Sequence, residues 1–193
     1  MSRIDYIRTV PPGTGGIDDA FLNRYVGIVG TKMIPYQWSM INNDEKSGII
    51  HDFRVAAREI GGEHIGMVFQ DEGLFKWLEA ASYDLADHPD TPLREWADFA
   101  VSLAEKAQQK NGYLLTYFML NCPDKEFHNL LESHELVCMG NILEAGIAWH
   151  QAVGDDFEKD LIRLLTDMLE TRTEITILGR VLAHQREQSA VNP

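Results

Sequence analysis

Hydrophobic positions recur at helical spacing along most of this chain. One stripe is especially regular, at i, i+3, i+4, i+7 and i+11, and predicts an amphipathic helix with the apolar residues Leu74, Trp77, Leu78, Ala81 and Leu85. Asp71 or Glu72 stands at its start, where a carboxylate suits the helix dipole. The same spacing continues over 93–110, and Thr91 and Pro92 are a favourable N-cap and first helical residue for that helix.

Less regular patterns predict two helices nearer the N-terminus. Asp18 or Asp19 can cap a helix with apolar residues over 21–29. Pro35 should end or kink that helix, because proline lacks an N–H and clashes with the preceding turn. A short helix is expected over 53–59.

The second half of the chain continues the helical pattern after one interruption. The apolar run 113–120 could be an extended segment or a short strand. A long helix is expected from about Leu130, closed by Gly154, and the stripes over 156–170 and 175–188 predict two more. The expected fold is all-α, with consecutive helix pairs that suit a helix-hairpin array or an α/α toroid.

Composition narrows the possible partners. Of 193 residues, 45% are apolar, which is typical of a globular chain. The net charge of −13 disfavours nucleic acid and anionic membrane surfaces. The lead-in 1–17 is turn-rich and has no secretory core, and no apolar run reaches the length of a membrane span, so we expect a cytoplasmic protein.

The densest chemistry lies in 131–141, LESHELVCMGN. It begins like a zinc-protease HExxH motif, but Cys138 occupies the place of the second histidine. His134 and Cys138 share a helix face and could both touch a metal, although two ligands do not make a site. Alternatively, this is the first turn of a buried helix, with Glu132 and Glu135 facing the dipole and His134 hydrogen-bonded.

Two further features have a functional and a structural interpretation. Asp71 and Glu72 could act as acid and base in glycoside hydrolysis, but carboxylates at a helix start are more often caps. Aromatic side chains could line a sugar-binding cleft; the regular spacing of Trp77 and Trp96 favours the core. Tyr113 and Tyr117 lie in the irregular run and are freer to line a pocket.

Four segments, taken together, resemble glycoside hydrolase family 127, the β-L-arabinofuranosidases. They are FRVAAREIGG (53–62), GMVFQDEGLFKWLEAASYDL (66–85), AQQKNGYLLTYF (107–118) and HNLLESHELVCMGNILEAGIAWHQAVG (128–154). The resemblance covers about residues 50–170 and implies an (α/α)6-barrel that hydrolyses terminal β-L-arabinofuranosyl linkages. It also implies a cysteine nucleophile beside a zinc ion held by cysteines and a glutamate.

The resemblance implies roles for some residues of this chain, but it provides no match for the family's zinc ligands or nucleophile. His134 matches a histidine that contacts the arabinose, Glu135 follows it in the motif, and Asp71 matches the first aspartate of the usual Asp-Ser-Asp. With Tyr113 they form the expected substrate-binding set. Neither of the two cysteines matches a zinc ligand or the nucleophile. We therefore expect no catalytic residue, no metal site and no cofactor in this chain.

The expected organisation is a lead-in over 1–17, an incomplete part-barrel over 18–170 and a divergent tail over 171–193. The leading hypothesis is an inactive, truncated portion of a glycosidase that binds an L-arabinofuranose-containing oligosaccharide or glycan. The alternative is a non-catalytic helical module that binds a carbohydrate or a protein. An open part-barrel would expose apolar helix faces, through which the chain could form a homo-oligomer.

Overall fold

A computed structural model describes residues 18–89, 92–130 and 132–154. Its elements are α1 (Ala20–Ile28), the π-helical turn η1 (Val29–Met33), α2 (Ile34–Ile41), α3 (Ile49–Ala56), α4 (Glu72–Asp87), α5 (Leu93–Ala107), α6 (Thr116–Asn121), the 3-10 turn η2 (Pro123–Lys125) and α7 (Glu135–Val153). These residues contain no strand, which confirms the all-α prediction. None of the described helices is long and apolar enough to cross a bilayer. The lead-in and the helices expected after residue 154 lie outside the described residues.

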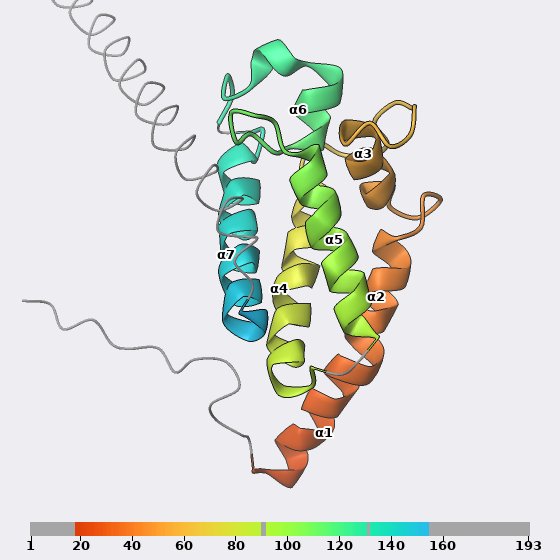
Figure 1. The fold of residues 1–193 in the computed structure, drawn as a ribbon, viewed down its shortest axis with the longest axis vertical. Helices are drawn as coiled ribbons and strands as arrows, with labels where there is room; N and C mark the ends of the chain where they lie inside the picture. Colours follow the sequence, from red (N-terminus) through yellow and green to blue (C-terminus); the bar gives the residue numbers. More distant parts are fainter. Residues whose placement is uncertain (1–17, 90–91, 131, 155–193) are drawn as a thin grey trace, which may run out of the picture.

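Helix α4 lies at the centre and packs against α7, α5 and α2. Helices α4 and α7 run in the same direction, while α5, which follows α4 in sequence, runs in the opposite direction on the other side of α4 (Figure 1). An antiparallel return between parallel neighbours is the repeating unit of a toroid of helix pairs. As a consequence, the N-terminal ends of α4 and α7 lie at the same edge of the molecule.

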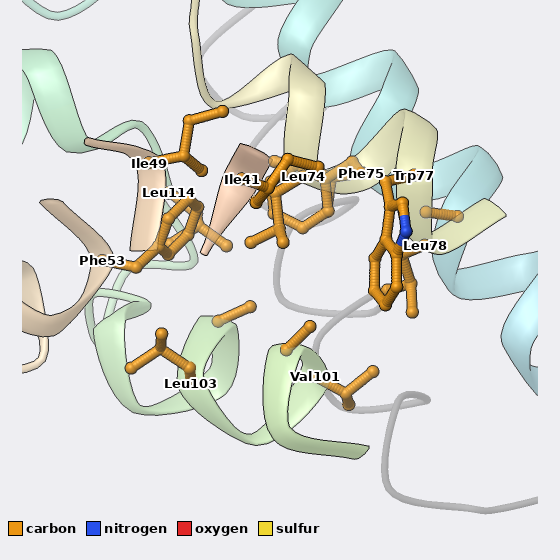
Figure 2. Packing of buried hydrophobic residues seen from close by; sticks show 14 of the residues in the cluster. Ile41, Ile49, Phe53, Leu74, Phe75, Trp77, Leu78, Val101, Leu103 and Leu114 are labelled. Carbon is orange, nitrogen blue, oxygen red and sulfur yellow. The ribbon is translucent and has the colours of Figure 1, made fainter. Parts of the chain in front are cut away.

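The core is built from the predicted stripes. All five apolar residues of the α4 stripe are buried, and side chains of α4 and α5 face one another in Figure 2, with Phe53 of α3 at one end. Trp77 belongs to this core, as predicted, and its indole N–H donates to the Ile34 carbonyl of α2 at 3.0 Å. Trp96 is only partly buried, stacked on Trp38 with 6.1 Å between ring centroids.

Pro35 does not end the first helix. Helix α1, capped by the Asp19 carboxylate as predicted, continues through η1 into α2 with right-handed helical backbone angles at both junctions. The helix widens into a π turn just before Pro35, which gives room for the proline ring that would clash with a normal preceding turn. Gly30 lies in this turn against Asp84 of α4.

Three predicted boundaries were wrong. The run 113–120, expected as an extended segment or a short strand, is extended at Leu115 but then enters α6 at Thr116, whose amide is held by a carboxylate distant in sequence. The helix expected over 53–59 begins earlier, at Ile49, after Gly48 in the left-handed region. The long helix begins at Glu135 rather than at about Leu130, and Gly154 ends it as predicted.

Candidate functional site

The N-terminal ends of α4 and α7 meet through an aromatic contact. Phe69, just before α4, and His134, at the N-cap position of α7, have ring centroids 5.0 Å apart and an interplanar angle of 31°. One turn into α7, the Cys138 thiol lies 3.9 Å from the Phe69 carbonyl oxygen. These two contacts connect the segment before α4 to the N-terminal end of α7.

His134 is exposed, and its backbone lies in the left-handed region at φ 56°. That conformation is uncommon for a residue with a Cβ and costs about 1 kcal/mol or more, so the surrounding structure must impose it. No side-chain cap hydrogen bond is made at this helix start. The imidazole is thus held at the surface by stacking rather than used as a cap.

The Glu135 side chain anchors the segment that leads into His134. Its carboxylate is fully buried and accepts hydrogen bonds from the Tyr113 hydroxyl at 2.7 Å, the Ser133 hydroxyl at 2.8 Å and the Phe127 amide at 2.9 Å. Phe127 also has a positive φ, of 60°. The carboxylate therefore fixes both ends of the segment that leads into His134.

Tyr113 supports the same carboxylate and does not line a pocket. It is completely buried beneath the site, with its ring edge-on to Phe127 at 5.5 Å. Burial and the neighbouring Glu135 charge raise the pKa of Tyr113 far above its usual range, so the hydroxyl stays protonated and donates. The expectation that Tyr113 is free to line a cleft is wrong, because the chain turns inward after Gly112.

Asp71 is likewise buried. Its two carboxylate oxygens accept from the Thr116 amide at 2.6 Å and the Thr116 hydroxyl at 2.7 Å, so Asp71 caps α6 across the fold rather than its own helix. Burial raises the pKa of Asp71 to about 6, although the Thr116 hydrogen bonds act in the opposite direction. Its neighbour Glu72 forms an ordinary ion pair with Lys76 at 3.1 Å.

A second polar cluster holds the loop that carries Phe69. The buried Asp52 carboxylate accepts from the Ile65 amide at 2.9 Å and the Gln70 side-chain amide at 2.7 Å, and lies 3.1 Å from the His64 imidazole. Burial raises the pKa of Asp52 and lowers that of His64. The sequence pattern did not indicate this cluster, because the short helix was expected only from Phe53 and Asp52 lies just before that residue.

A cleft of about 280 Å³ opens beside the His134–Phe69 contact. Val68 and Ser133, the residues that directly precede those two rings, line one part of it, and Tyr117 lines another. The prediction that Tyr117 could line a pocket is therefore consistent with its position. The rim carries Lys125, Asn129 and other polar residues of the segment before α7.

The described residues do not fit a zinc ion. No three His, Cys, Asp or Glu side chains among residues 18–89, 92–130 and 132–154 come together as a metal site. His134 and Cys138, the pair with ligand spacing, diverge: the imidazole is exposed and the thiol is completely buried. Burial raises the pKa of Cys138 to about 12, so this thiol is protonated at neutral pH.

The described residues thus form an all-α array in which α4 packs against α7, with His134 at the start of α7. The family model for the beta-L-arabinofuranosidase GH127 catalytic domain matches residues 17–180, and the chain belongs to that family. It is 34% identical over 174 residues to a non-reducing end beta-L-arabinofuranosidase of Bifidobacterium longum subsp. longum, an alignment that covers 80% of this chain and 26% of the relative.

Solved structures of the family confirm the fold class, part of an (α/α)6-barrel. A GH127 beta-L-arabinofuranosidase from Geobacillus stearothermophilus superposes with a TM-score of 0.77 at 40% identity, over 81% of this chain and 25% of that one. A second GH127 beta-arabinofuranosidase gives a TM-score of 0.72 at 27% identity, over 83% and 26%. The chain thus spans about a quarter of the length of these relatives.

Proposed function

We propose that this chain is a sugar-binding portion of a glycoside hydrolase, which contacts a terminal β-L-arabinofuranosyl residue through His134. One observation carries the proposal: an exposed imidazole stands at the shared edge of two parallel helices, in a strained backbone conformation. Strained residues that the surrounding structure holds in place are found preferentially at binding and active sites. The identity of the sugar is taken from the names of the relatives, which are beta-L-arabinofuranosidases.

Glu135, Asp71 and Tyr113 have positioning roles in this proposal. Their side chains are buried and engaged in internal hydrogen bonds, so contact with a ligand at the surface falls to His134. Glu135 and Tyr113 fix the segment before His134. Asp71 fixes the start of α6 at Thr116.

We further propose that the 193-residue chain does not turn over arabinofuranosides. The resemblance implies a thiolate nucleophile beside zinc, and the chain has only Cys122 and Cys138. Cys138 is buried and protonated, and the described residues gather no metal ligand set. The chemistry that this part of the family fold supports is recognition of the sugar.

Titration of the isotopically labelled full chain with methyl β-L-arabinofuranoside, followed by amide chemical shifts, tests the binding proposal. We expect saturable shifts around His134 and Phe69 that His134→Ala abolishes. Val137→Ala, an exposed position on the same helix, is the matched control and should bind normally. Equal binding by the His134→Ala variant would refute the role of the imidazole.

Activity is measured separately with a chromogenic β-L-arabinofuranoside. We expect no release of the chromophore above the buffer rate. Turnover that disappears in the His134→Ala variant would contradict the proposal that the chain lacks activity.

A second candidate function is protein binding, and one observation favours it. Helix α1 buries none of its residues, and its large apolar side chains are 39% to 67% exposed: Phe21, Leu22, Tyr25, Val26 and Ile28. A contiguous apolar face of this kind suits a partner chain or a second copy. Size-exclusion chromatography with light scattering tests the second-copy case, since a monomer at all concentrations excludes self-association through this face.

A further inference from the structure

The cleft beside His134 has the chemistry of a second sugar subsite. We infer that it binds the neutral sugar residue on the leaving-group side of the scissile bond, an inference that rests on the proposed function above. A sugar at the non-reducing end of a glycan is linked to the next residue on one side only, and one relative acts on such terminal arabinose. If His134 contacts that terminal residue, the next residue must lie along one neighbouring surface.

Position identifies this surface as the cleft. Ser133 and Val68 line it, and each is adjacent in sequence to a member of the His134–Phe69 contact. The cleft therefore begins one residue along the chain from each of the two rings. Its volume of about 280 Å³ lies just below the range of about 300–1,000 Å³ for drug-sized ligands, so it suits one monosaccharide unit.

The walls suit a carbohydrate in two respects. The Tyr117 ring provides an aromatic face, which packs against the C–H surface of a sugar. The rim provides donors and acceptors for hydroxyl groups: the Lys125 ammonium, the Asn129 amide and the Glu132 carboxylate. A cationic and an anionic group are both present, so the rim favours a neutral sugar over a charged one.

Contacts within the chain also hold three of the lining side chains in place. Tyr117 is held edge-on by His64 and by Phe118, with ring centroids 5.2 Å away in each case. The Asn129 amide nitrogen donates to the Glu132 carboxylate at 2.8 Å, and its oxygen accepts from the Glu132 amide at 3.3 Å. Preorganised side chains lose little entropy when a ligand binds, which favours affinity.

The test compares two ligands on the full chain: methyl β-L-arabinofuranoside, which fills only the His134 side, and a β-L-arabinofuranosyl disaccharide. We expect the disaccharide to bind about three- to tenfold more tightly, the gain typical of one aromatic contact. Tyr117→Ala should remove this gain and leave the affinity for the methyl glycoside unchanged. Tyr117→Phe should retain most of it.

Each outcome distinguishes the two proposals. Equal affinity of both ligands for the unsubstituted chain, or equal loss of both in the Tyr117→Ala variant, overturns the second subsite and leaves the His134 contact intact. Absence of binding by either ligand overturns the proposed function, and the subsite with it. If Tyr117→Ala does not fold, Lys125→Ala at the exposed rim replaces it, with a selective loss of disaccharide affinity as the expected result.

Discussion

The buried Glu135 carboxylate provides the sharpest prediction about this protein. It accepts from three donors, Tyr113, Phe127 and Ser133, and no cation pairs with it among the ion pairs of the described residues. Glu135→Ala leaves the Tyr113 hydroxyl and the Phe127 amide buried without an acceptor. Glu135→Gln keeps the shape and can serve all three groups, because the Ser133 hydroxyl can turn to accept from the new amide.

The magnitudes follow from these counts. Two stranded donors at about 1–3 kcal/mol each give a loss of about 2–6 kcal/mol for Glu135→Ala, with about 4 kcal/mol as the central expectation. Ser133 adds less, because the residue keeps 7% of its surface exposed and its hydroxyl can rotate to another partner. For Glu135→Gln we expect about 1–2 kcal/mol, the difference between a charged and a neutral acceptor.

Urea unfolding followed by tryptophan fluorescence measures both free energies. Glu132→Ala is the matched control, since it removes an exposed glutamate close by in the same segment and should cost about 0.5 kcal/mol or less. The reasoning is refuted if Glu135→Ala and Glu135→Gln are equally stable, or if Glu135→Ala matches the control. A folded Glu135→Ala variant should also bind methyl β-L-arabinofuranoside more weakly, since His134 loses its support.

Three other predictions follow from single residues. Gly30→Ala should destabilise the fold by at most about 1 kcal/mol, because the new Cβ would stand 2.3 Å from an Asp84 carboxylate oxygen, which must rotate away and lose its contact with His88. Gly27→Ala meets no atom within 4 Å and should be neutral or stabilising, and equal effects of the two substitutions in urea unfolding would contradict the packing argument. Because folding raises the pKa of Asp71 from 3.8 to about 6, this group adds about 3 kcal/mol to the free energy of unfolding below pH 4, and the contribution is lost as the pH rises through about 6. Urea unfolding at several pH values should show this loss in the unsubstituted chain relative to Asp71→Asn. The same pH dependence in both proteins would count against it. In a thiol assay with a disulfide reagent, Cys122 should react rapidly and Cys138 only after denaturation, since Cys138 is buried with its pKa raised to about 12; two fast thiols in the native chain would disprove this.

The spacing of hydrophobic residues in the sequence was enough to predict the helices that bury one continuous apolar face. The spacing over 72–87 and 93–107 is enough to specify an amphipathic helix, because each stripe has the same period as the helix itself. Asp19 and Gly154 mark helix ends through local backbone chemistry, and they too were readable from the sequence. The resemblance of four segments to one family determined the fold class.

The tertiary structure decided where polar side chains point. In the sequence, three residues are equal candidates for ligand contact: Asp71, Tyr113 and Glu135. In the structure they bind residues far along the chain instead: Glu135 accepts from Tyr113, 22 residues away, and Asp71 accepts from Thr116, 45 residues away. Helix α6 exists where a strand seemed possible, because the Asp71 carboxylate satisfies the first amide of α6 across the fold. Local spacing carries no information about such pairings, since burial and hydrogen bonding depend on which helix ends the fold brings together.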